Sequence, residues 1–266
     1  MLHAWVPQNA LAKSMQPKFL TQSVTKSAIK LIAVSAIFMP LTATFAMQNA
    51  CSASSGAALT PVIELYTSQG CSSCPPADEW LSTLKKAQAD GKVVAQAFHV
   101  NYWDYIGWTD KFAAPTHTTR QRQVSAASGL SGIYTPQLVK NGLTVRDYER
   151  AIQSTETARA QLKISQTAPD SFEASVTPGD SAVQWSAYFT VTEHGHVSKV
   201  TAGENKGENL SNNFVVRQYV QLGSYSGAQT LKFSTLAMGK THPRQVNLVV
   251  TQSKTGKPLQ AISLGC

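Results

Sequence analysis

Several features that mark other classes of protein are missing from this sequence. Charged residues make up only 14% of the chain, and no cluster of Lys and Arg stands out. The formal net charge of +8 falls to +4 without the first 46 residues, which contain four lysines and no acid. Because that remainder is modest, we expect no nucleic-acid partner. The chain also lacks an internal repeat and a glycine-rich phosphate loop in a strand–loop–helix setting.

Long hydrophobic runs are scarce as well. The apolar run over residues 31–39 is too short to span a bilayer comfortably. Two lysines precede it, Pro40 breaks it, and small residues follow as far as Ala46. This order is typical of a secretory signal peptide, predicted over residues 1–46, with a lead-in segment over 47–60. The mature chain is therefore expected to be periplasmic or secreted, without a stable membrane span.

Cysteine is rare, and the four cysteines all follow the predicted signal peptide: Cys51, Cys71, Cys74 and Cys266. An even number in an exported chain permits two disulfides, and four cysteines allow three pairings. Their positions favour a Cys71–Cys74 pair and a structural Cys51–Cys266 disulfide that joins the ends of the mature chain. Lipidation of Cys51 is the alternative for that residue.

The pattern of apolar residues predicts two domains. Residues 61–164 read as an α/β domain and residues 165–266 as an antiparallel β-sandwich-like domain, because the second part alternates apolar and polar residues between regularly spaced turns. In the first domain we expect strands over 61–67, 93–100 and 134–142, and helices over 71–89, 115–128 and 146–163. An Asn-Gly pair at the end of the third strand indicates a hairpin.

Six stretches carry a resemblance to a known family: "ELYTSQGCSSCPPAD" (64–78), "FHVNYWDYIGW" (98–108), "RQRQ" (120–123), "YTPQLVKNG" (134–142), "AGENKGENL" (202–210) and "NFVVRQ" (213–218). The chain resembles an exported family, domain of unknown function 1223, which is assigned to the thioredoxin-like superfamily. The resemblance implies a thioredoxin-like first domain with an insertion between Cys74 and Pro136. It also implies a cis Thr135–Pro136 bond facing the two cysteines, and it carries no agreed activity.

A Cys-x-x-Cys pair at the start of a helix has a defined chemistry. The helix dipole and unpaired N–H groups favour negative charge there and lower the pKa of the first thiol. Cys71 would then attack and Cys74 would resolve the mixed disulfide. This predicts thiol–disulfide exchange with protein thiols or disulfides of the cell envelope, without a cofactor. It requires an accessible, partly ionised sulfur on Cys71.

Two further residues are candidates for this site. Pro136 would present backbone to an extended substrate segment. Glu64 interrupts an apolar strand that leads to the cysteines, and it is similar in position to the buried acid of thioredoxin. A buried carboxyl group there would have a raised pKa and would move protons during exchange. The alternative is that Glu64 points to solvent or pairs with a lysine.

Other interpretations of the same residues stay open. Copper(I) accepts two soft thiolates, so Cys71 and Cys74, with His99 as a third ligand, would suit a copper-binding or copper-delivery protein. A closed zinc site is disfavoured, because the chain has no second Cys-x-x-Cys and no close His pair of the usual spacing. A non-catalytic binding module with a structural disulfide is the third interpretation. The aromatic residues of 102–108 would line a substrate groove or pack in the core.

Overall fold

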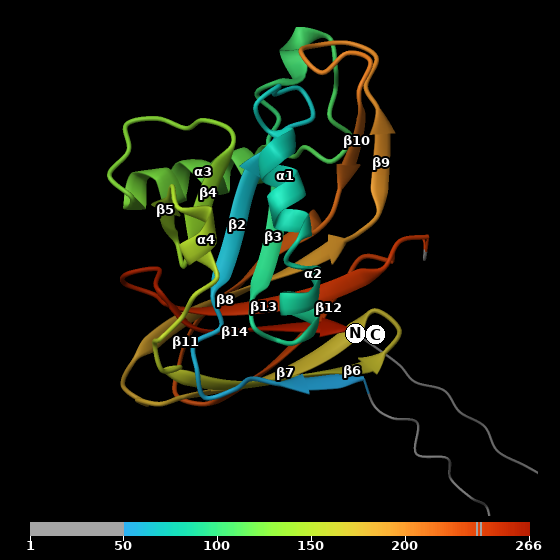
Figure 1. Cartoon of the computed structure of the whole chain (residues 1–266). Helices are drawn as coiled ribbons and strands as arrows, with labels where there is room; N and C mark the ends of the chain where they lie inside the picture. Colours follow the sequence, from blue (N-terminus) through green and yellow to red (C-terminus); the bar gives the residue numbers. More distant parts are fainter. Residues whose placement is uncertain (1–50, 238, 240) are drawn as a thin grey trace, which may run out of the picture. The chain divides into compact units, whose positions relative to one another are not determined.

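Strands dominate the part of the chain that the computed structural model describes, residues 51–237, 239 and 241–266. The signal peptide predicted over residues 1–46 and the start of the lead-in segment, residues 47–50, lie outside these residues. The described strands form three sheets, of eight, four and two strands (Figure 1). Among the same residues, no helix has both the length and the apolar character needed to cross a membrane.

Strands and helices alternate in the first part of the described chain. They are β1 (Ser52–Ser54), β2 (Val62–Thr67), α1 (Pro75–Ser82), α2 (Lys85–Ala89), β3 (Val94–His99), the 3-10 helix η1 (Asp104–Ile106), α3 (Pro115–Ala127), β4 (Gln137–Lys140), β5 (Leu143–Val145) and α4 (Tyr148–Ala151). The helix predicted over 71–89 begins only at Pro75 and is interrupted after Ser82. The hydroxyls of Ser82 and Thr83 donate to carbonyl oxygens of the preceding turn, a competition that ends helices locally.

The second part of the described chain is almost entirely strand. Its elements are β6 (Ala160–Ala168), β7 (Ser171–Pro178), β8 (Gln184–Glu193), β9 (His196–Lys199), β10 (Asn209–Asn212), β11 (Val215–Ser226), β12 (Gln229–Ser234), β13 (Arg244–Gln252) and β14 (Pro258–Gly265). The sheet β1-β6-β7-β12 contributes to the same apolar core as β8, β13 and β14. Trp185 and Ile164 are fully buried in that core.

The helix predicted over residues 146–163 is wrong for most of its length. Only α4 forms there, and β6 begins at Ala160. Ala160, Leu162 and Ile164 alternate with exposed residues and enter the core, while β6 pairs with β1 and β7. Pairing and burial on one face therefore outweigh the helical composition of the segment.

One sheet joins strands from both sides of residue 165. Its order is β14-β13-β8-β11-β3-β2-β4-β5, and β3 meets β11 through the parallel pair Ala97 and Val215. The Ala97 N–H donates to the carbonyl of Phe214 at 2.8 Å, which extends the hydrogen bonding across this junction. The domain boundary near residue 165 stays a prediction.

Strand β2 lies inside this sheet, with a helix against each face (Figure 1). It pairs parallel with β3 and antiparallel with β4. Ile63 and Leu65 pack with the α1 residue Leu81, whereas Tyr66 packs with Val124 of α3. Because side chains alternate along a strand, α1 and α3 cover opposite faces of β2. The carboxyl end of β2 leads directly to the cysteine loop.

Candidate functional site

The loop after β2 contains the two neighbouring cysteines. Cys71 and Cys74 form a disulfide with a Cα–Cα distance of 5.5 Å, as predicted. Cys74 is the N-cap of α1, and Pro75 occupies the first helical position, where no N–H is needed. The second predicted disulfide, Cys51–Cys266, is also confirmed, with a Cα–Cα distance of 6.1 Å.

The Cys71–Cys74 disulfide is buried. Cys71 is 1% exposed and Cys74 is fully buried, although Ser72 and Ser73 between them are exposed. The expectation of an accessible Cys71 sulfur is therefore wrong for this disulfide form. The reason is that two segments distant in sequence pack over the loop.

The first covering segment is residues 202–208, between β9 and β10. The side-chain amide of Asn205 donates to the carbonyls of Gln69 and Cys71, at 2.9 and 3.0 Å. The Ser72 N–H donates to the carboxylate of Glu204 at 2.9 Å. The side chains of this segment thus bind backbone groups of the cysteine loop, not the side chains of that loop.

The second covering segment contains η1. A Cβ added at Gly70 would lie 3.1 Å from Cβ of Trp103 and 3.3 Å from Cδ1 of Ile106. A Cβ added at Gly203 would lie 2.9 Å from the same Ile106 carbon, and Gly203 has a φ of +76°. Glycine is needed at both positions because Ile106 packs between the two loops. Of the two interpretations of residues 102–108, packing therefore describes Trp103, whereas Tyr105 is 82% exposed.

Pro136 lies at the same end of the sheet. The Thr135–Pro136 bond is cis, as the family resemblance implies. It precedes β4, in which Gln137 is opposite Tyr66 of β2, so continuing the register places Pro136 beside Thr67. The indole N–H of Trp103 donates to the Thr135 hydroxyl at 2.8 Å. Trp103 thus connects the cis-proline segment with the loop before Cys71.

The carboxyl group on the cysteine side of β2 belongs to Asp78, which the sequence analysis missed. Asp78 is 8% exposed and accepts a hydrogen bond from the Thr67 hydroxyl at 2.7 Å. It lies four residues after Cys74 on α1, and this spacing sets both side chains on the same side of the helix. Burial raises the pKa of Asp78 to about 6. The signal in the sequence that could have identified Asp78 was its position four residues after Cys74 in "CSSCPPAD".

Glu64 lies on the opposite face of β2 from Asp78. Its carboxylate accepts hydrogen bonds from Arg120 of α3 at 2.8 and 2.5 Å and from the Tyr66 hydroxyl at 2.6 Å. The alternation of side chains along β2 separates it from α1. The structure therefore does not bring Glu64 together with the cysteines, and its partner is an arginine rather than a lysine.

His99 follows the same end of β3 and is paired with Asp110. Its Nδ1 is 2.6 Å from the Asp110 carboxylate, which also accepts the Gln69 N–H at 2.9 Å. Burial lowers the pKa of His99, but the carboxyl groups of Asp110 and Asp78 together outweigh it, so the net shift is upward. The other ring nitrogen has no hydrogen-bond partner in the described part of the chain.

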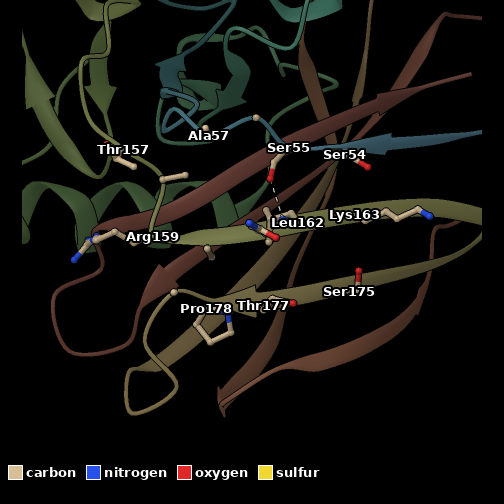
Figure 2. A pocket seen from close by; sticks show the side chains of 15 residues that line it. Ser54, Ser55, Ala57, Thr157, Arg159, Leu162, Lys163, Ser175, Thr177 and Pro178 are labelled. Atoms are coloured by element: carbon tan, nitrogen blue, oxygen red, sulfur yellow. Dashed lines mark hydrogen bonds between the residues drawn. The ribbon is translucent and has the colours of Figure 1, made fainter.

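The alternative copper ligands are not brought together as a group of three. Within the described ranges, no three or more His, Cys, Asp or Glu side chains are arranged to hold a metal ion. Cys71, Cys74 and His99 are therefore not assembled as a ligand set. The hollow shown in Figure 2 is lined by residues of 54–57, 157–163 and 175–179, and it contains none of the predicted catalytic residues.

Comparison with known proteins identifies the family. The family model "Protein of unknown function (DUF1223)" matches residues 62–252, and the chain belongs to this family. No curated protein matches the chain.

Two solved structures are similar to this protein. A crystal structure of a protein from Agrobacterium tumefaciens is 28% identical, with a TM-score of 0.60, covering 79% of this chain and 96% of the other. HBP35 of Porphyromonas gingivalis is 12% identical, with a TM-score of 0.57, covering 79% of this chain and 76% of the other. The second likeness concerns the fold alone.

Proposed function

We propose that this protein carries out thiol–disulfide exchange through Cys71 and Cys74, on a thioredoxin-like framework. The observation that carries the proposal is the position of Asp78, a buried carboxyl group one helical turn after Cys74 that accepts a hydrogen bond from the Thr67 hydroxyl and lies near enough to His99 to interact with it electrostatically. A disulfide at a helix start that is held only for stability has no need of a buried acid with a raised pKa.

The exchange uses the two cysteines in order. A substrate thiolate attacks Sγ of Cys71, the Cys71–Cys74 bond breaks, and its electron pair leaves on Cys74. The neutral Asp78 carboxyl group gives Cys74 its proton. A second substrate thiolate then displaces Cys71 from the mixed disulfide. The substrate thiols end as a disulfide. Of the two protons that they release on becoming thiolates, one restores the Asp78 carboxyl group and the other protonates the Cys71 thiolate; the reverse sequence reduces a substrate disulfide.

The cis Thr135–Pro136 segment supports a place for substrate backbone next to this loop. The burial of Cys71 means that the reaction requires residues 202–208 to move aside. We place the reaction in the periplasm or outside the cell, with protein thiols or disulfides as partners. The predicted signal peptide and two disulfides in one chain support that placement.

The experiment is catalysed reduction of insulin disulfides by dithiothreitol, together with refolding of scrambled ribonuclease. We expect Cys71→Ser to lose both activities. The matched control is the Cys51→Ser/Cys266→Ser double variant, which also loses one of the two disulfides but keeps Cys71 and Cys74. It should retain activity while it remains folded by circular dichroism. Equal activity of wild type and Cys71→Ser would refute the proposal.

A structural disulfide in a binding module is the second candidate, because Cys71 is only 1% exposed. The midpoint potential of the Cys71–Cys74 couple separates the two. A structural disulfide resists the glutathione pool, with a potential below about −300 mV, whereas an exchanging disulfide has a higher potential.

A further inference from the structure

The segment that covers the disulfide, residues 202–208, has two polar side chains with different tasks. Asn205 is 6% exposed, and its amide joins the carbonyls on both sides of Gly70. Glu204 is exposed to solvent, and its carboxylate accepts the N–H of Ser72, the residue next to Cys71. Any thiol that reaches Cys71 must displace the first contact and pass close to the second.

The charge at this position is negative and stays so at neutral pH. The hydrogen bond from the Ser72 N–H lowers the pKa of the Glu204 carboxyl. Ser72 and Ser73 bring no cation to the loop. Lys206 and Glu208 of the same segment are exposed and make no salt bridge among the described residues. The Asp110 carboxylate, which accepts the Gln69 N–H of the same loop, is buried, so Glu204 is the solvent-exposed carboxylate that is hydrogen-bonded to the cysteine loop.

We propose that residues 202–208 select the thiols that react at Cys71: Asn205 restricts access to the disulfide, and Glu204 disfavours thiols that carry a negative charge near the sulfur. The preferred substrates are neutral or cationic around the reacting cysteine. This inference rests on the proposed function and names its substrate class. Its physical basis is like-charge repulsion at the point of attack, which raises the barrier for anionic thiolates with anionic substituents.

The test uses three thiols of the form HS–CH₂–CH₂–X: 2-mercaptoethanol, which is neutral, cysteamine, which is cationic, and 2-mercaptoethanesulfonate, which is anionic. Each attacks Cys71 to form a mixed disulfide and frees the Cys74 thiolate, and acid quenching with intact-mass measurement gives the rate. Dividing each variant's rate by the wild-type rate for the same thiol removes the differences in thiol pKa.

For Glu204→Gln we expect the rate with mercaptoethanesulfonate to rise about threefold relative to the rate with mercaptoethanol, and the gain to shrink in 1 M salt. The cysteamine rate should not rise. Glu208→Gln is the matched control, because it removes the same charge from the same segment without contacting the cysteine loop. For Asn205→Ala we expect all three rates to rise together by about tenfold, since two hydrogen bonds that hold the cover are lost.

Equal changes for all three thiols in Glu204→Gln, or equal effects of Glu204→Gln and Glu208→Gln, would overturn the charge selection. An unchanged rate in folded Asn205→Ala would overturn the restricted access. Because these rates report only chemical opening of the disulfide, they stand apart from insulin reduction. If the wild type reduces insulin but Glu204→Gln changes all three thiol rates equally, only this inference fails. If Glu204→Gln shows the expected charge effect but the wild type does not catalyse insulin reduction, the proposed function fails.

Discussion

Glu64 and Asp78 are both buried carboxyl groups beside strand β2, but they lie on opposite sides of it and have different partners. Glu64 is held by the guanidinium of Arg120, by Tyr66 and, at 3.3 Å, by Tyr188. Asp78 receives one neutral hydroxyl, that of Thr67. From the sequence, Glu64 is the candidate acid because its strand leads to the cysteines. In the structure, Asp78 is the acid that lies on their side of the sheet.

The difference teaches which buried acid is available for chemistry. A paired carboxylate is a structural charge, because protonating it would leave the buried cation uncompensated. For Asp78, burial outweighs both the attraction of His99 and the hydrogen bond from Thr67, so the acid holds its proton more tightly and its pKa moves toward the pH at which proton transfer is useful. Three substitutions test this contrast, in order of expected effect.

The largest effect is expected from Arg120→Leu. This variant leaves the Glu64 carboxylate buried without its cation, so the free energy of unfolding should fall by about 3–5 kcal/mol. Urea denaturation followed by circular dichroism measures it. Arg122→Leu is the control, because Arg122 is an exposed arginine on the same helix. A loss of the same size in both variants would mean that the ion pair with Glu64 does not stabilise the fold.

The second-largest effect is expected from Asp78→Asn, which should raise the free energy of unfolding at neutral pH, whereas Arg120→Leu lowers it. The native pKa of Asp78, about 6, exceeds its unfolded value of 3.8. Between these values the unfolded chain releases a proton that the native state keeps, so stability falls as pH rises from about 4 to 6 and the deficit stays constant above. Removing the acid should therefore stabilise the protein at pH 7.5 by up to about 3 kcal/mol, with little change at pH 4.

Urea denaturation of wild type and Asp78→Asn from pH 4 to 8 gives that difference directly. Glu79→Gln is the control, since Glu79 is the neighbouring exposed acid on α1. A stability gap independent of pH would show that Asp78 does not titrate in this range. The same variant should slow the exchange reaction, because Cys74 loses its proton donor.

The smallest effect is expected from Thr67→Val. It removes the hydroxyl that stabilises the ionised Asp78, so the pKa of Asp78 should rise further and stability at pH 7.5 should fall by about 1 kcal/mol. Carboxyl-carbon NMR titration measures the pKa. Thr119→Val is the control, since its hydroxyl bonds only a carbonyl of its own helix. An unmoved Asp78 titration would remove Thr67 from the site.

Local patterns predicted much of the fold. The apolar strands over 61–67 and 93–100, the helix over 115–128 and the Asn-Gly hairpin all have counterparts in β2, β3, α3 and the β4–β5 pair. These signals are local, because strand composition, proline at a helix start and turn chemistry act within a few residues. The segment 146–163 failed because the pairing of β6 with β1 and β7 spans the chain.

The sequence by itself determined that Cys71 and Cys74 stand at the start of a helix, since spacing and proline placement are local properties. It also indicated the two disulfide pairs. Only the tertiary structure decided that Glu64 faces away from them, that Asp78 faces toward them and that residues 202–208 cover Cys71. Those outcomes depend on which face of β2 each helix packs against and on a contact between residues more than 130 positions apart, as in the 132-residue separation of Ser72 and Glu204. No local pattern encodes such a contact.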